Sequence, residues 1–261
     1  MNWLYVPNRK FTYEEALDQR MTGTGTWFLR SCEYEQWKSG TAAPSIWLHG
    51  IPGCGKTVLS SIVVENLLKD CELRPNERVV HYFFDIRSDE SRTTDDFLRS
   101  CTVQLTKNWS TVLPPSVLAL YTSCNDGAYP PFSGELLPIL ETYITGVSHC
   151  YLIIDALDEC ADLPKLMKIL ETMQQWNVPG LHILVTSRNE KDITKQLQCF
   201  PNIDISNGLT DSDIHDFIER TLLQDARMAK WRNSSEHLLQ ISKRLNEGAN
   251  GMSVCINLFS Q

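Results

Sequence analysis

A glycine-rich run near residue 50 has the residue types and spacing that suit phosphate binding. Residues 50–57 read GIPGCGKT and match the pattern G-x-x-x-x-G-K-[ST] at every defined position. Glycines let backbone N–H groups approach phosphate oxygens where side chains would clash. The lysine supplies a mobile cation for the β and γ phosphates, and the threonine hydroxyl can ligate Mg²⁺. The run therefore predicts a site for a purine nucleoside triphosphate, with ATP/ADP and Mg²⁺ as the expected cofactors.

The residues expected to contact the nucleotide follow one another along this loop and into the next helix. They are Gly50, Ile51, Pro52, Gly53, Cys54, Gly55, Lys56, Thr57 and Val58. A helix that begins near Lys56 would add the positive end of its dipole to the phosphate site. Cys54 stands at a variable position of the pattern, so we interpret it as a spacer, with a reactive thiol as the alternative.

An acidic cluster after a second apolar run is the expected other half of the site. The run YLIID ends at Asp155, and Asp158 and Glu159 follow closely. Asp155 would hold Mg²⁺ together with Thr57, directly or through water. Asp158 and Glu159 would polarise the attacking water or complete the outer shell of the metal. The alternative is that these acids only solvate the start of a helix.

A third apolar run ends in the polar sequence TSR at residues 186–188. If its strand neighbours the other two, Arg188 would sense the γ-phosphate or stabilise charge in the transition state. The alternative is a surface arginine at the start of a helix. The predicted catalytic residues are Asp158, Glu159 and Arg188, and the predicted metal ligands are Thr57 and Asp155.

The apolar pattern also predicts the elements that would position these residues. Continuous apolar runs that alternate with helical periodicity indicate a parallel sheet covered on both faces. The expected strands are 45–49, 79–84, 151–155 and 181–186, with a weaker one at 203–205. The expected helical segments are 27–37, 57–68, pieces of 107–150, 211–223 and 234–245.

These elements divide the chain into three parts. Residues 1–43 form a helical segment, 44–208 form the nucleotide-binding domain, and 209–261 form a C-terminal helical segment that we expect to be incomplete. With 261 residues and 42% hydrophobic content, the chain can bury one large α/β core and a small helical part.

Charge and cysteine content narrow the possible partners and compartments. The net charge of −8 argues against a nucleic-acid partner. No signal-peptide run opens the sequence, and no stretch reaches the roughly 18 apolar residues of a membrane span. The nine cysteines form no C-x-x-C pair, which favours reduced, buried thiols over a disulfide framework or a zinc site. We therefore predict a cytoplasmic protein without a membrane partner.

Three motifs in succession resemble the NACHT subgroup of the STAND NTPases. They are WLHGIPGCGKT, IIDALDEC and LVTSR, and they look closest to the fungal NOD-like receptor form, also called the nephrocystin-like N-terminal domain. The segment 23–29, followed by Trp37, is similar to that family's element before the first strand. The resemblance covers roughly residues 20–255.

This resemblance implies a P-loop three-layer sandwich whose five-stranded parallel sheet has the order 5-1-4-3-2. In that order the strand before Arg188 lies between the P-loop strand and the Asp155 strand. Ala156 directly after Asp155 fits this family better than the AAA+ motors, which place Glu there. The family also implies that Thr24 to Trp27 lie near the base. Its members usually carry an effector domain before this module and a winged helix and repeats after it, and none of these fits in the chain.

The function implied by the resemblance is an ATP/ADP switch that hydrolyses ATP slowly and signals through protein assembly or self-association. It is associated with fungal non-self recognition and programmed cell death. One alternative is an interaction module that nucleotide stabilises without hydrolysis. The other is a small-molecule kinase, for which the sequence shows no arginine-rich lid.

Overall fold

The computed structural model describes residues 2–4, 10–18, 20, 23–41, 43–87, 92–106, 114–206 and 213. The helices expected at 211–223, apart from Asp213, and at 234–245 lie outside the described residues. Within the described part, no helix is both long enough and apolar enough to span a membrane. The described cysteines are free thiols: Cys32, Cys54, Cys71, Cys101, Cys124, Cys150, Cys160 and Cys199.

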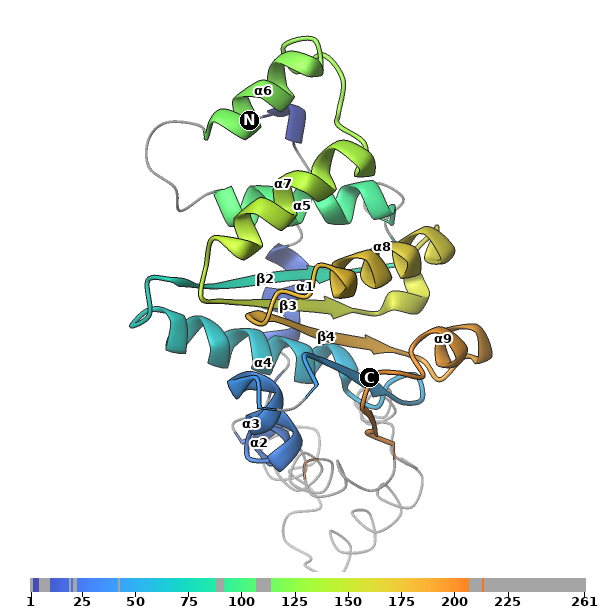
Figure 1. The fold of residues 1–261 in the computed structure, drawn as a ribbon. Coiled ribbons are helices and arrows are strands. Elements are labelled where there is room, and N and C mark those ends of the chain that lie inside the picture. Colours follow the sequence, from blue (N-terminus) through green and yellow to red (C-terminus); the bar gives the residue numbers. More distant parts are fainter. Residues whose placement is uncertain are drawn as a thin grey trace, which may run out of the picture.

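Five parallel strands form one sheet in the order β2-β3-β4-β1-β5, which confirms the expected 5-1-4-3-2 arrangement (Figure 1). The strands are β1 (Ser45–His49), β2 (Glu77–Phe83), β3 (His149–Asp155), β4 (Leu181–Ser187) and β5 (Asn202–Asp204). Every residue of β1 and β4 is buried, because helices cover both faces of the central strands. Burial on both faces explains why these strands appear in the sequence as continuous apolar runs.

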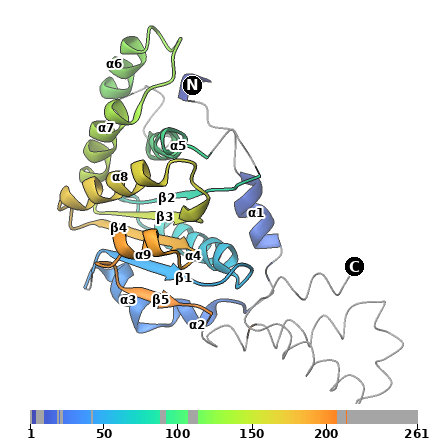
Figure 2. The same ribbon diagram turned by 90° about the vertical axis from the view of Figure 1, so that its right-hand side faces the viewer.

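Helices lie in two layers, one on each face of the sheet (Figures 1 and 2). They are α1 (Lys10–Asp18), α2 (Thr26–Leu29), α3 (Cys32–Ser39), α4 (Lys56–Cys71), α5 (Thr94–Thr106), α6 (Pro115–Ser123), α7 (Ser133–Thr145), α8 (Leu163–Gln175) and α9 (Lys191–Gln196). Two short 3-10 helices are η1 (Asn2–Leu4) and η3 (Leu157–Glu159). Helices α1 to α4 cover one face, α5 and α8 cover the other, and α7 packs on α5. Helix α6 packs on α7, away from the sheet (Figure 2).

The core is divided by the alternation of side chains along the strands. In β1, Ile46 and Leu48 belong to the cluster under α4, whereas Trp47 belongs to the cluster under α5 and α8. Successive strand residues point to opposite faces, so a single strand contributes to both layers. Strand β1 pairs with β4 on one side and with β5 on the other, so the loop after it begins at the carboxyl end of an inner strand.

The expected helix over 27–37 is wrong as a single element. Helix α2 ends at Leu29, and α3 begins at Cys32. Ser31 lies in extended conformation between them, and its Oγ accepts a hydrogen bond from the Tyr34 N–H. A serine in this position caps a new helix rather than continuing the old one. The helical pieces expected in 107–150 are confirmed by α6 and α7, and residues 107–113 lie outside the described part.

Candidate nucleotide-binding site

The glycine-rich loop follows β1 and leads directly into α4. Gly53 and Gly55 have φ values of 76° and 95°, in the left-handed region that residues with a Cβ rarely adopt. A Cβ on Gly50 would lie 2.7 Å from both Cys54 Sγ and Ser206 Oγ. The fold of this loop therefore requires the glycines of the motif at these positions.

The ammonium group of Lys56 is held by backbone carbonyl groups of the same loop. Lys56 Nζ donates hydrogen bonds to the carbonyl oxygens of Gly50 and Ile51, both at 2.8 Å, and lies 3.7 Å from Cys54 Sγ. Burial raises the pKa of the Cys54 thiol, although the nearby ammonium opposes this rise. A neutral buried thiol fits the interpretation of Cys54 as a spacer better than a reactive role.

Asp155 lies at the end of β3 and is 1% exposed. Its Oδ2 accepts a hydrogen bond from Thr57 Oγ1 at 2.7 Å. Its Oδ1 accepts hydrogen bonds from Ser60 Oγ at 2.8 Å and Thr186 Oγ1 at 2.6 Å. Burial raises the pKa of Asp155, and the three hydroxyls oppose that rise. The structure thus brings together Thr57 and Asp155, the two predicted metal ligands.

The chain turns sharply after Asp155. Ala156 has a φ of 56°, and its N–H donates a hydrogen bond to Thr186 Oγ1 at 3.0 Å. Helix η3 begins at the next residue and carries the acidic pair Asp158 and Glu159. The neighbouring strand β4 therefore supports the turn through which the acidic pair is presented.

Two predicted catalytic residues form an ion pair. Arg188 Nε lies 3.0 Å from Asp158 Oδ2, and the Arg188 backbone N–H donates to Asp158 Oδ1 at 3.0 Å. The Asp158 side chain is 5% exposed, whereas that of Arg188 is 46% exposed. The guanidinium is thus anchored on one side and open to solvent on the other.

Glu159, the third predicted catalytic residue, points to a different element. Its Oε2 accepts a hydrogen bond of 2.7 Å from the backbone N–H of Ile86, which follows β2. Burial raises the pKa of Glu159, this hydrogen bond lowers it, and Asp158 raises it further. Glu159 is therefore held against the β2 side of the site, while Asp158 is held against the β4 side.

Several contacts of this site involve residues that the motifs do not contain. They are Ser60, the backbone N–H of Ile86, and Ser206, whose Oγ accepts a hydrogen bond from the Ile51 N–H at 2.9 Å. Thr186 belongs to the LVTSR motif, but its hydrogen bond to Asp155 was not predicted. Ser60 follows Thr57 by three residues, a spacing that puts both side chains on one helix face. That spacing is the one signal in the sequence that would have indicated its role.

The segment 24–27, which we expected near the base, lies against α4. A Cβ on Gly25 would come within 3.0 Å of Leu59 and Ile62. The Gly25 backbone N–H donates to Asp213 Oδ2 at 2.7 Å, which ties this segment to the C-terminal part of the chain. Contact of Thr24 to Trp27 with the base stays a prediction.

The donor chemistry of the site fits magnesium. A hydroxyl and a carboxylate oxygen 2.7 Å apart are hard oxygen donors of the kind that Mg²⁺ prefers. Among the described residues, no group of three or more His, Cys, Asp or Glu side chains is arranged to hold a metal ion. Mg²⁺ commonly uses one or two protein ligands together with substrate phosphates, so such a group is not required here.

A parallel sheet of this order, with a glycine-rich loop after β1 and a buried aspartate at the end of β3, defines a P-loop NTPase nucleotide-binding domain. The sequence profile of the family described as "Nephrocystin 3, N-terminal" matches residues 23–188. The chain belongs to this family, which agrees with its resemblance to NACHT domains of the fungal NOD-like receptor type.

One curated relative and several solved structures are similar to the chain. It is 24% identical over 245 residues to the vegetative incompatibility protein HET-E-1 of Podospora anserina. The aligned region covers 90% of this chain and 18% of that protein. Among solved structures, AMPPCP-bound DnaA from Aquifex aeolicus has a TM-score of 0.43 at 14% identity, over 84% of this chain and 56% of that one. The Aeropyrum pernix ORC1 protein in complex with DNA has a TM-score of 0.47 at 11% identity, over 86% and 59%.

Proposed function

We propose that this chain is an ATP·Mg²⁺-binding switch of the NACHT type that hydrolyses ATP slowly and signals through assembly with protein partners. The observation that carries the proposal is the 2.7 Å hydrogen bond between Thr57 and Asp155. It joins the start of α4 to the end of β3 beside Lys56, where a triphosphate and its metal would need both side chains.

The phosphate-binding step follows from the loop. The backbone N–H groups of residues 50–58, apart from Pro52, which has none, would face the phosphates. Lys56 would exchange the carbonyl oxygens of Gly50 and Ile51 for phosphate oxygens. A hydrogen bond from an ammonium to an ionised phosphate is stronger than one to a neutral carbonyl, so nucleotide favours the exchange. Thr57 and Asp155 would hold Mg²⁺, which would neutralise charge on the β and γ phosphates.

The acidic pair supports slow hydrolysis. Activation of water needs a carboxylate that is free to accept a proton. Asp158 is engaged by Arg188, and Glu159 is engaged by the Ile86 N–H. These contacts restrain both carboxylates and the Arg188 guanidinium, which supports slow rather than fast activation of water. We therefore assign slow catalysis to Asp158, Glu159 and Arg188.

The same contacts favour a second candidate function. If Asp158 and Glu159 stay engaged, the chain retains ATP without hydrolysis and nucleotide acts as a stabilising ligand of an interaction module.

The similarity to a vegetative incompatibility protein supports protein partners and a role in fungal non-self recognition. The net charge of −8 supports a partner other than nucleic acid, and we place the protein in the cytoplasm without a membrane partner.

The test is a single-turnover experiment on the full chain. The purified protein, in excess, is incubated with γ-labelled ATP and Mg²⁺, and retained nucleotide and released phosphate are followed for several hours. Retention with slow release, both lost in Lys56→Ala, supports the switch. Retention without release selects the non-hydrolysing module, and absence of retention contradicts both.

A further inference from the structure

The two carboxylate oxygens of Asp155 are occupied unequally. Oδ1 accepts hydrogen bonds from Ser60 and Thr186, and both of these residues are 0% exposed. Among the described residues, Oδ2 accepts its hydrogen bond from Thr57. Each carboxylate oxygen offers about two lone-pair positions. Among the described residues, Oδ1 therefore accepts hydrogen bonds from two hydroxyls, whereas Oδ2 accepts one, from the other predicted metal ligand.

The Thr186 hydroxyl has both of its hydrogen-bonding directions fixed. It donates to Asp155 Oδ1 and accepts from the Ala156 N–H. Ala156 adopts a φ of 56°, which is unfavourable for a residue with a Cβ. Thr186 thus orients the carboxylate and also stabilises the turn directly after it. One hydroxyl on β4 couples these two features of the β3 end.

Ser60 differs from the serine next to it. Ser61 Oγ donates to the Thr57 carbonyl oxygen of its own helix at 2.8 Å, the usual bond of a serine inside a helix. Ser60 Oγ instead donates across the layer to Asp155 on β3. Both serines are fully buried. Ser61 therefore bonds to a backbone carbonyl of its own helix, whereas Ser60 holds the Asp155 carboxylate.

We propose that Ser60 and Thr186 are positioning residues for magnesium, which hold Oδ1 of Asp155 so that Oδ2 is the oxygen presented to the metal or its water. The inference rests on the proposed ATP·Mg²⁺ function and gives a role to two residues to which the sequence analysis assigned none. Outer partners of a metal-binding carboxylate fix its orientation, and their loss typically lowers metal affinity by about 10- to 100-fold.

The experiment compares nucleotide binding with and without magnesium. The dissociation constant of a fluorescent, non-hydrolysable ATP analogue is measured for the full chain in EDTA and across a Mg²⁺ titration. For Thr186→Val and Ser60→Ala we expect the Mg²⁺ midpoint to rise about tenfold or more. The dissociation constant in EDTA should change little, because the loop and Lys56 are intact. Thr186→Ser should restore the wild-type midpoint.

Matched controls separate this role from packing. Ser61→Ala and Thr102→Val each remove a buried hydroxyl that bonds to a carbonyl of its own helix, and both should keep the wild-type Mg²⁺ midpoint. Thermal unfolding of every variant identifies folding defects, and Ser60→Ala tests the inference by itself if Thr186→Val does not fold.

The outcomes distinguish the inference from the function on which it rests. Unchanged Mg²⁺ midpoints in both variants, or equal losses with and without Mg²⁺, overturn the positioning role while leaving nucleotide binding in place. Failure of the wild-type chain to bind the analogue overturns the proposed function and this inference together.

Discussion

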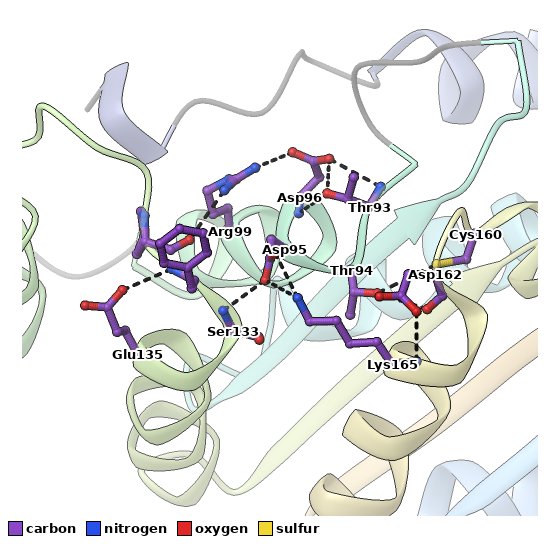
Figure 3. Close-up of polar contacts among 12 residues, drawn as sticks. Thr93, Thr94, Asp95, Asp96, Arg99, Ser133, Glu135, Cys160, Asp162 and Lys165 are labelled. Carbon is purple, nitrogen blue, oxygen red and sulfur yellow. Dashed lines mark hydrogen bonds and ion pairs between the residues drawn. The ribbon is translucent and has the colours of Figure 1, made fainter.

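Two acidic clusters, one at the start of α5 and one at the end of β3, have their charges balanced differently. At the start of α5, Asp95 accepts hydrogen bonds from Lys165 Nζ at 2.9 and 3.0 Å and from the Ser133 N–H at 2.9 Å (Figure 3). At the end of β3, Asp155 accepts hydrogen bonds from three neutral hydroxyls. Lys56 acts on Asp155 at longer range, because its ammonium hydrogen-bonds to the loop carbonyls.

The difference separates a structural cluster from the proposed metal site. Next to Asp95, Asp96 pairs with Arg99, so the cluster neutralises its charges within the protein and joins α5, α7 and α8 (Figure 3). A buried carboxylate without a close cation is costly, and a bound cation removes that cost. Asp155 is such a carboxylate, which makes it the acid in this comparison that gains most from a metal.

The largest expected effect concerns hydrolysis and uses one glutamate from each region. Glu159 accepts the Ile86 N–H at 2.7 Å, and Glu135 accepts the Phe132 N–H at 3.0 Å in the structural cluster (Figure 3). Glu159→Gln should slow phosphate release by about 100-fold or more, the typical contribution of a general base. Glu135→Gln should leave the rate unchanged in the same single-turnover assay. Equal rates in both variants would remove Glu159 from the catalytic set.

The next effect concerns nucleotide affinity and compares two lysines. Lys56→Ala should weaken ATP binding at least about tenfold, or about 1.4 kcal/mol, because a charge-assisted phosphate contact is lost. Lys165→Ala removes the cation of the structural cluster and should leave the affinity unchanged. Equilibrium binding of labelled ATP measures both. An unaltered affinity in Lys56→Ala would contradict the assignment of the loop.

For the free energy of unfolding, we expect the structural cluster to matter more than the proposed metal site. Asp95→Asn leaves Lys165 without its carboxylate and should lower the free energy of unfolding by about 1–2 kcal/mol. Asp155→Asn removes a buried charge that hydroxyls alone solvate, so it should cost less, although it should abolish the magnesium dependence of binding. Urea unfolding of both variants checks this. A larger loss in Asp155→Asn would mean that the β3 end is built mainly for stability.

Much of the architecture was predictable because its signals are local. Central parallel strands are buried on both faces, so β1, β3 and β4 appear as continuous apolar runs. The phosphate loop requires consecutive residues, and Asp155 ends a strand, so both halves of the site were visible.

The contacts that hold the site were less visible because they cross between elements. Thr186 lies in the polar end of an apolar run and Ser60 lies inside an apolar helix, and their common partner appears only when the strand order is known. The Ile86 contact uses a backbone N–H, which no residue type reveals. The break between α2 and α3 depends on the backbone conformation of Ser31.

The smallest expected effect concerns a partly buried basic group, His81 in β2. Its ring packs against Tyr13 and Phe83, with ring centroids 5.2 and 5.8 Å away, and burial lowers the pKa of His81 to about 4. The unfolded chain, with a histidine pKa of about 6.5, therefore binds more protons than the folded chain between these values. The stability from neutral His81 is present above about pH 6.5 and is lost as the pH falls toward 4.

Between pH 7 and pH 6 this histidine should lower the free energy of unfolding by about 0.5 kcal/mol, allowing for partial solvent screening. His81→Phe preserves the ring packing and should flatten this part of the profile, measured by urea unfolding at each pH. Burial also lowers the pKa of His182, so part of the slope should persist in the variant. An unchanged slope in His81→Phe would show that His81 is solvated well enough to titrate as in the unfolded chain. Of His81 and Asp155, only the aspartate would then have a charge state that its position in the fold controls.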